Sequence, residues 1–342
     1  MYYFTNDYSE GAHPRILQAL LDTNLQQVGG YGEDPFCLEA AELIKEKLGR
    51  SDVDVHFIPG GTQTNMIALA AFLRPHEAVI APVTGHIEVH EAGAIEATGH
   101  KIIPLPGKDG KLRPEDVQEA VDFHLDEHMV KPRLVFISNA TEIGSIYTKA
   151  ELEALSAFCR RHNLLLYVDG ARLGSALTSP ANDLTLAEVA GLVDAFYIGG
   201  TKNGALIGEA LVICSESLRE DFRYHMKQRG ALLAKGRLLG LQFRELFRDN
   251  LFFDLAQHAN AMAAKLQQAM ENLGCSFLLH SVSNQIFPIL PNSVIAELRR
   301  DFSFLTWKKL DEERSIVRMV ASWSCPEEAV DQFIARLTEL LS

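Results

Sequence analysis

The sequence lacks the motifs of several common protein classes. Its 342 residues include only five cysteines, which are scattered and form neither a CxxC pair nor a Cys/His zinc spacing. No apolar run reaches the ~18 residues that a membrane span needs, and neither a fixed-period repeat nor a low-complexity tract occurs. A P-loop and a GxGxxG motif are also absent. We therefore expect reduced thiols in a cytoplasmic protein without a bound metal.

Positive charge is scarce as well. The chain has 32 Lys and Arg against 45 Asp and Glu, a net charge of −13, which disfavours a nucleic-acid partner or an anionic membrane surface. The first seven residues contain no basic segment leading into an apolar one, so we expect no signal peptide. What is present, 47% apolar and 23% charged residues, is ordinary for a globular protein. A chain of this length predicts one large and one small domain.

Strands alternate with helices through the first two thirds of the chain. This alternation predicts an α/β fold with a mainly parallel sheet covered by helices on both faces. The αββαβ-like order of the last ~95 residues predicts a smaller α+β unit. We expect a large domain of residues 1–247, with an N-terminal arm and helix over about 1–30, and a small domain of residues 248–342. The strands of the large domain are expected at residues 53–59, 78–81, 101–105, 134–139, 164–168, 194–199 and 209–214.

Two strand ends carry a pair of residues with a shared chemistry. The strand 164–168 ends at Asp169, and the strand 194–199 leads through small residues to Lys202. A pyridoxal phosphate (PLP) enzyme needs an aspartate to hold the pyridine nitrogen and a lysine to form a Schiff base. Each residue also has a plainer interpretation, because Asp169 could begin an ordinary turn and Lys202 could lie at a hairpin tip.

Two further strand ends favour the same chemistry. Gly60, Gly61 and Thr62 separate a strand from a helix, which makes an anion site, although a tight βα turn explains the glycines equally well. His86 follows a strand and begins a helix, where an imidazole could stack on a cofactor or move a proton. It could also be a structural histidine or, least favoured, form a metal site with His90.

Several arginines and lysines are candidates for binding anions. Arg172, three residues after Asp169, could pair with a substrate carboxylate or a cofactor hydroxyl. Arg318 could clamp a carboxylate or be a surface cation. Among the basic residues of 218–246, Arg229 and Lys235 are candidates to reach a phosphate in a neighbouring subunit. The cluster His124, Asp126, Glu127 and His128 is interpreted as a solvated helix face and not as a metal site.

The joint order of these elements is more specific than any one of them. In an open parallel sheet the carboxyl ends of the strands share one crevice, so a glycine cup, a histidine, an aspartate and a lysine at strand ends would meet. The chain resembles the PLP-dependent, fold-type-I threonine aldolase and β-eliminating lyase family over nearly its full length. The resemblance lies in residues 31–35, 59–65, 86–94, 168–172 and 200–204.

The resemblance implies a fold like that of aspartate aminotransferase, with PLP as the cofactor. It implies that Lys202 is the Schiff-base lysine, that Asp169 pairs with the pyridine nitrogen and that His86 is the stacked, catalytic histidine. Arg172 and Arg318 would bind the substrate carboxylate. The other cofactor contacts implied are those of Gly60, Gly61, Thr62, Arg172 and Thr201.

The resemblance also implies an active site shared between subunits. This sequence differs from the family pattern at two places. Tyr31 would reach the active site of the adjacent subunit in a homodimer or homotetramer. Asn6 stands where relatives have a serine that contacts the substrate carboxylate, so we keep it as a substrate-binding candidate. Many threonine aldolases carry Asn-Thr-His-Asn after the strand that ends here at Asn139, where this chain has no histidine. The turn 201–204 is closer to the low-specificity and phenylserine branch.

These observations predict an aldolase. It would cleave β-hydroxy-α-amino acids such as L-threonine, L-allo-threonine or phenylserine to glycine and an aldehyde, with His86 or a water that it positions as the base. The alternatives are another fold-type-I reaction, either β-elimination or transamination, and a non-catalytic small-molecule binding protein without a cofactor.

Overall fold

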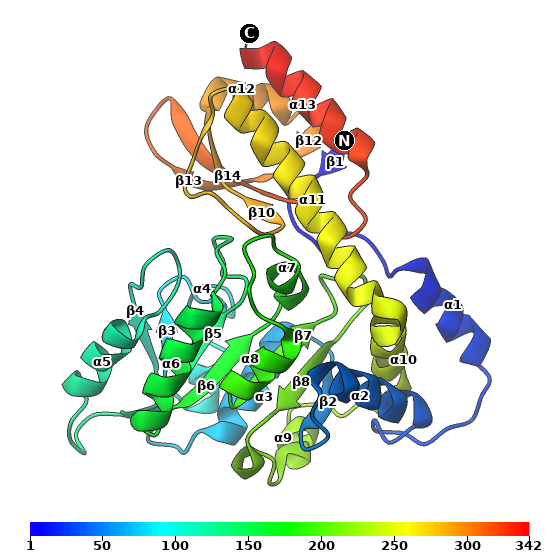
Figure 1. Ribbon diagram of the computed structural model, residues 1–342, viewed down its shortest axis with the longest axis vertical. Helices are drawn as coiled ribbons and strands as arrows, with labels where there is room; N and C mark the ends of the chain where they lie inside the picture. The colour runs from blue at the N-terminus through cyan, green and yellow to red at the C-terminus, as the bar shows by residue number, and fades with distance from the viewer. Residues whose placement is uncertain (342) are drawn as a thin grey trace.

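A seven-stranded sheet forms the centre of the larger part of the molecule (Figure 1). The computed structural model describes residues 1–341. The strand order is β2-β8-β7-β6-β5-β3-β4, and only β8 runs antiparallel to its neighbours, which confirms the predicted, mainly parallel sheet. The strands are β2 (Asp54–Ile58), β3 (Glu77–Pro82), β4 (Ile102–Leu105), β5 (Lys131–Ser138), β6 (Leu165–Asp169), β7 (Ala195–Gly199) and β8 (Glu209–Ile213).

Helices cover both faces of this sheet. Helices α2, α5, α6, α8 and α10 contribute to one apolar cluster, and α3, α4 and α9 contribute to a second. Three short 3-10 turns connect elements: η1 (Glu96–Thr98), η2 (Glu216–Leu218) and η3 (Arg248–Asn250). The helices are α2 (Pro35–Leu48), α3 (Gly61–Phe72), α4 (His86–Val89), α5 (Pro114–Phe123), α6 (Lys149–Arg161), α7 (Leu173–Leu177), α8 (Leu186–Leu192), α9 (Phe222–Gln228) and α10 (Arg237–Phe247).

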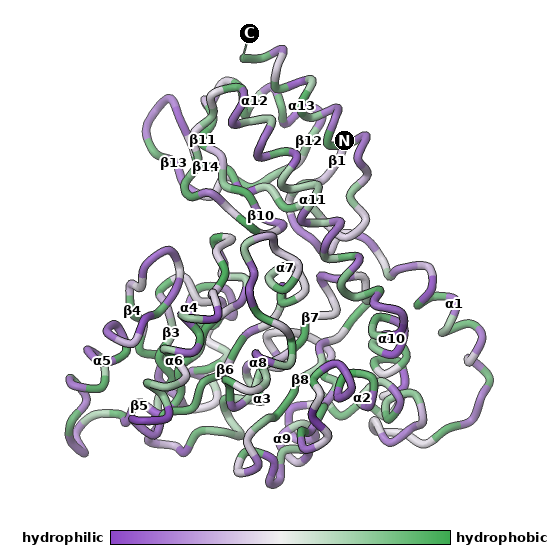
Figure 2. Tube along the Cα trace, viewed as in Figure 1, coloured by the Kyte–Doolittle hydropathy of each residue, from purple (hydrophilic) through white to green (hydrophobic). Residues whose placement is uncertain are grey.

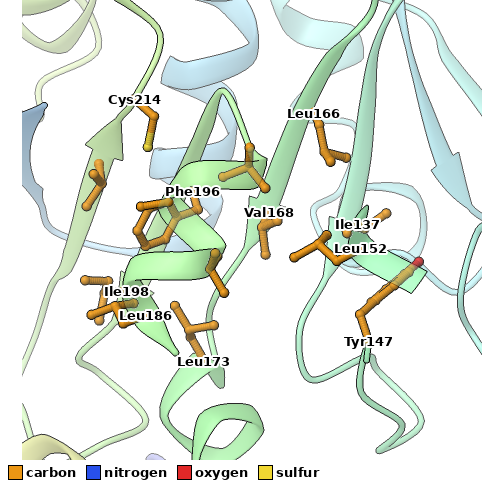
Figure 3. Close-up of a cluster of buried hydrophobic side chains, with 14 of the residues drawn as sticks. Ile137, Tyr147, Leu152, Leu166, Val168, Leu173, Leu186, Phe196, Ile198 and Cys214 are labelled. Carbon is orange, nitrogen blue, oxygen red and sulfur yellow. The ribbon is translucent and has the colours of Figure 1, made fainter. Parts of the chain in front are cut away.

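The central strands are apolar on both sides because each face packs against helices. Successive residues of a strand point to opposite faces, so Leu166 and Val168 join one cluster and Leu165 and Tyr167 join the other. Figure 2 shows the resulting concentration of hydrophobic residues along the middle of the sheet. Figure 3 shows one of the two clusters, in which Val168 and Phe196 of neighbouring strands lie on the same side.

A smaller antiparallel sheet forms the C-terminal part and confirms the predicted α+β unit. Its order is β10-β14-β11-β9, with β13 paired to β14. The long helix α11 connects it to the larger part (Figure 1). No helix within residues 1–341 is long and apolar enough to cross a membrane. The elements are α11 (Leu251–Asn272), β9 (Ser276–Phe277), β10 (Gln285–Ile286), β11 (Pro288–Pro291), α12 (Asn292–Leu298), β12 (Phe302–Ser303), β13 (Leu305–Lys309), β14 (Arg314–Val320) and α13 (Glu327–Leu341).

The N-terminal arm returns to this C-terminal part. Strand β1 (Tyr2–Tyr3) pairs in parallel with β12, and Phe4 is fully buried in the apolar cluster of the small sheet and α13. The chain then passes to α1 (Pro14–Thr23), beside α10. The first residues of the arm therefore pack with the unit predicted to begin at residue 248. The division into residues 1–247 and 248–342 stays a prediction.

The crossing of α2 and α10 depends on a glycine. A Cβ atom at Gly240 would lie 2.5 Å from Cys37 Sγ and 2.6 Å from the Cys37 backbone nitrogen. We expect Gly240→Ala to lower the free energy of unfolding by roughly 2 kcal/mol or more, because the clash outweighs the better helix propensity of alanine. Gly191→Ala in α8 is the matched control, since nothing lies within 4 Å of its Cβ position. Urea unfolding measures both, and an unchanged midpoint for Gly240→Ala would contradict this packing.

Candidate active site

One cavity of about 1000 Å³ gathers most of the predicted site residues. Its wall comes from the start of α3, the segment around α4, the ends of β6 and β7 and the strands β13 and β14 of the small sheet. Asp169 is buried directly beside it, hydrogen-bonded to the cavity-lining Tyr197. The predicted residues in the wall are Gly60, Gly61, Thr62, His86, Arg172, Thr201, Lys202 and Arg318.

Backbone contacts between two strand ends bring Asp169 and Lys202 to the same place. A Cβ atom at Gly170 would lie 1.8 Å from the Tyr197 carbonyl oxygen, and one at Gly199 would lie 2.3 Å from the Ala171 carbonyl oxygen. Only glycine permits this approach, so the turns after β6 and β7 touch each other. Lys202 lies in the connection between the antiparallel β7 and β8, and its side chain lines the cavity, so its role as a Schiff-base lysine stays a prediction.

The environment of Lys202 makes its ammonium group easier to deprotonate than that of an ordinary lysine. Burial and the nearby Arg172 guanidinium lower the pKa of Lys202, and this effect outweighs the opposing carboxylates of Asp7, Glu142 and Asp169. An amine that loses its proton more easily is a better nucleophile toward a carbonyl.

The Asp169 carboxylate is held by three donors. The Tyr197 hydroxyl donates to Oδ1 at 2.6 Å, the Ala171 N–H donates to Oδ1 at 3.0 Å, and Asn65 Nδ2 donates to Oδ2 at 3.0 Å. Asn65 and Tyr197 were not among the predicted site residues. Asn65 lies inside the motif 59–65, but its role depends on a partner 104 residues away.

A hydrogen-bonded chain connects this aspartate to His86. Asn65 Nδ2 also donates to Glu91 Oε1 at 2.8 Å, and the same oxygen lies 2.8 Å from His86 Nδ1. Burial lowers the pKa of His86, but the hydrogen bond with Glu91 and the charges of Glu142 and Asp169 outweigh it, so the pKa is raised. Glu91 therefore orients His86 and favours its protonated form, and the sequence analysis did not assign it a role.

The start of α3 offers unused backbone donors to the cavity. Gly60 is the N-cap residue and has no side chain to accept hydrogen bonds from the first N–H groups of the helix. These residues line the cavity, so their N–H groups are available to a ligand. The positive end of a helix dipole adds to these donors. The glycine cup is thus both a tight turn and a site suited to a phosphate.

The two arginines in the cavity differ in their partners. Arg172 Nε and Nη2 donate to the two oxygens of Asp7 at 2.7 and 3.0 Å, and both side chains are buried. Arg318 makes no ion pair within residues 1–341: its Nη2 donates weakly to the Thr5 carbonyl at 3.4 Å, and its guanidinium lies 5.7 Å from the Trp307 ring centre. Of these two arginines, Arg172 has an acidic partner within residues 1–341 and Arg318 has none.

The remaining candidates lie outside this cavity. The Asn6 side chain accepts hydrogen bonds from the Tyr8 N–H and the Ser9 hydroxyl. Tyr31 is half exposed beneath the Lys227 ammonium, Arg229 contacts His225 and Gln228, and Lys235 is exposed. The predicted contacts of Tyr31, Arg229 and Lys235 with a neighbouring subunit stay predictions.

The histidines considered for a metal site are placed differently. His86 and His90 lie with ring centres 5.5 Å apart, and both line the cavity. Across residues 1–341 no group of three or more His, Cys, Asp or Glu side chains could hold a metal ion. The cluster 124–128 follows the end of α5, so it is a mainly exposed turn and not a helix face.

Glu209 is a buried carboxyl group at the floor of the cavity. Its Oε2 accepts the Gly200 N–H at 2.9 Å, in the turn that carries Lys202. Burial raises the pKa of Glu209 from its ordinary value of 4.5 to about 8. The folded protein therefore keeps a proton that the unfolded chain releases between these two values. The stability that this provides is present below pH 4.5 and is lost as the pH rises through about 8.

We expect Glu209→Gln to reduce the pH dependence of stability in the cofactor-free protein. Between pH 5 and 8 the wild type should lose roughly 1–3 kcal/mol more free energy of unfolding than the variant, since one pKa unit is worth about 1.4 kcal/mol and the nearby Lys202 charge offsets part of the shift. Urea unfolding at several pH values measures the difference. The exposed Glu88→Gln is the control, and parallel curves for Glu209→Gln and wild type would refute the prediction.

Comparison with solved structures supports the fold. A threonine aldolase from Leishmania major is 53% identical to this chain and superposes on it with a TM-score of 0.99. The superposition covers 100% of both chains. An aromatic aminotransferase from Pyrococcus horikoshii has a TM-score of 0.72 at 16% identity, with 99% of this chain and 95% of that chain covered. The second likeness confirms the predicted fold type I.

Sequence comparison gives the family. The low specificity L-threonine aldolase of Pseudomonas aeruginosa is 34% identical over 335 residues, which cover 96% of this chain and 94% of that protein. The protein of the same name from a Pseudomonas sp. is 32% identical over 347 residues, covering 99% and 98%. A family model described as beta-eliminating lyase matches residues 13–290. The chain therefore belongs to the threonine aldolase and β-eliminating lyase family.

Proposed function

We propose that this protein is a PLP-dependent aldolase that cleaves the Cα–Cβ bond of β-hydroxy-α-amino acids. Its products are glycine and an aldehyde, and its substrates are L-threonine, L-allo-threonine and phenylserine. One observation carries this proposal: Lys202, Asp169 and the unpaired Arg318 meet at one cavity in a chain that is 53% identical to a threonine aldolase.

The donor set of the cavity fits PLP. The uncapped start of α3 suits the phosphate, Asp169 suits a protonated pyridine nitrogen, and Lys202 with its lowered pKa suits the aldehyde carbon. Thr62 and Thr201 line the same wall, and His86 faces it from the segment after β3. Gly60 leaves room for the phosphate, because no atom lies within 4 Å of a Cβ position there, whereas a Cβ atom at Gly61 would lie 3.2 Å from the Tyr197 hydroxyl.

When bound, PLP supplies an electron sink for the negative charge that develops at the substrate Cα. The residues of this chain bind and orient. Arg318 offers a planar pair of donors to the substrate carboxylate, which fixes how the Cα–Cβ bond lies in the cavity. The hydrogen bonds from Tyr197 and Asn65 hold the Asp169 carboxyl group in one position in the cavity wall.

The raised pKa of His86 bears on its predicted role as the base. A histidine whose pKa is raised holds its proton more strongly near neutral pH, and an imidazolium donates hydrogen bonds but accepts no proton. While it is protonated, His86 is suited to donate toward a cofactor or substrate oxygen.

We also propose a homodimer or homotetramer in the cytoplasm. Large apolar side chains of the N-terminal region are exposed, and burying them between copies of the chain would remove apolar surface from water. The five cysteines are all free, which is compatible with a reducing compartment. The exposed side chains are Leu17, Leu21, Leu25 and Tyr31.

The first test concerns Lys202 and the reaction class. Borohydride treatment of the yellow wild-type protein should fix the cofactor to the peptide that contains Lys202, as read by mass spectrometry. Lys202→Ala should lose this attachment, and glycine release from L-allo-threonine should fall by at least about 10³-fold. The exposed Lys101→Ala is the control.

Other products would change the assignment. Pyruvate and ammonia would indicate β-elimination, and conversion of the bound cofactor to its amine form would indicate transamination. A wild-type protein that binds the cofactor but releases no glycine from L-threonine, L-allo-threonine or phenylserine would refute the aldolase proposal.

The second test concerns the carboxylate clamp. Arg318→Lys keeps the charge but loses the planar pair of donors, so we expect KM for L-allo-threonine to rise about 10–100-fold. Arg299→Lys is a matched control, because this arginine also stacks on an aromatic ring, that of Phe304 between β12 and β13, but lies outside the cavity. Steady-state kinetics separate KM from kcat. An unchanged KM in Arg318→Lys would assign the carboxylate to another group.

A further inference from the structure

Glu142 is an acidic residue of the cavity whose carboxylate has no assigned partner. It lines the cavity wall, and only 7% of the residue is exposed. Across the described chain, residues 1–341, its carboxylate makes no hydrogen bond and no ion pair. A carboxylate held in a cavity without a protein partner is free to act on a molecule that enters the cavity.

The loop that carries Glu142 is fixed at both ends. The Thr141 N–H donates to the Ser145 carbonyl at 2.8 Å, and the two hydroxyls of these residues lie 2.8 Å apart. The Ser281 hydroxyl donates to the Gly144 carbonyl at 3.2 Å, which attaches the loop to the small sheet's side of the cavity. Glu142 therefore projects from a tight turn held by both parts of the molecule, which suits a group that must meet a substrate in one position.

The other carboxylates around the cavity are already engaged. Asp7 accepts both donors of Arg172, and Glu91 is shared by Asn65 and His86. Asp169 accepts from Tyr197 and Asn65, and Glu209 accepts from the Gly200 N–H. The charged or titratable side chains that influence or are influenced by Glu142 are Lys202, Arg172, Arg318, His86 and His90.

We propose that the Glu142 carboxylate is the base that removes the proton from the β-hydroxyl group of the substrate. This inference rests on the proposed aldolase function and adds the residue that carries out its proton transfer. The hydroxyl O–H bond breaks and its proton passes to a Glu142 oxygen, while the O–H electron pair forms the aldehyde C=O bond. The Cα–Cβ pair remains with Cα, which takes up one proton to give glycine. Glu142 releases its proton to water, so all atoms of the substrate are recovered in the two products.

The roles of Glu142 and His86 are then complementary. His86, oriented by Glu91, donates a hydrogen bond, and Glu142 accepts a proton. Both side chains face the same cavity, together with Arg318. A substrate whose carboxylate is bound by Arg318 can therefore present its β-hydroxyl to Glu142.

Glu142→Gln tests the proposal, because the amide keeps the shape of the side chain but cannot take the proton. We expect glycine release from L-allo-threonine to fall by about 10²–10⁴-fold, the usual contribution of a general base. Exchange of the glycine α-proton with deuterium from the solvent involves no β-hydroxyl group, so its rate should stay within about 3-fold of the wild type. The affinity for glycine, read from the change in visible absorption of the loaded protein, should also stay within about 3-fold.

Two further variants give the controls. Glu142→Asp keeps a carboxylate on a shorter side chain and should recover part of the glycine release that Glu142→Gln loses. Glu88→Gln removes an exposed carboxylate two residues after His86, outside the cavity, and should change none of the three measurements.

The possible outcomes separate the two proposals. If the wild type releases glycine and Glu142→Gln does so within about 3-fold of the same rate, the inference is wrong and the aldolase proposal stands. If release, exchange and glycine affinity all fall together in Glu142→Gln, Glu142 has a structural role and the inference is also wrong. If the wild type releases no glycine from any β-hydroxy amino acid, both proposals fail.

Discussion

The buried carboxylate of Asp169 is the constraint on which the site depends. A charge removed from water is costly unless donors replace its solvation. Its donors come from three elements: Asn65 from α3, Tyr197 from β7 and the Ala171 N–H from the turn after β6. Satisfying this carboxylate therefore fixes α3 and β7 relative to β6. The uncapped start of α3 and the turn with Lys202 are placed by the same contacts.

Ion pairing then decides which of the other charged side chains of the cavity are available to a ligand. Asp7, carried by the N-terminal arm, pairs with the buried Arg172, whereas Arg318 from the small sheet has no acidic partner among residues 1–341. The arm begins as a strand beside β12, so the residue that pairs with Arg172 is held by both parts of the molecule. Both Arg318 and Glu142 line the cavity, and these are the residues that we propose for the substrate carboxylate and for the proton of its β-hydroxyl group.

Much of the fold was predictable because its signals are local. Helix α6 begins where Thr148 and Glu151 form a capping box, a signal that depends on only four consecutive residues. The strands ending at Asp169 and leading to Lys202 were recognisable as apolar runs bounded by glycine. Several site residues were predictable for a related reason, since strand ends of a parallel sheet share one crevice wherever the strands lie in the sequence.

The sequence by itself determined the alternation of strands and helices, the lysine and aspartate at two strand ends and the glycine cup, because each is a pattern within about ten residues. Only the tertiary structure decided which partners these residues have. Asp7 meets Arg172 across 165 positions, and Asn65 joins Asp169 to Glu91 across 104 and 26. Glu142 became a candidate only because its carboxylate lines the cavity and pairs with no side chain in the described part of the chain. No local pattern carries such information, because hydrogen bonds and buried charges are satisfied in space and not along the chain.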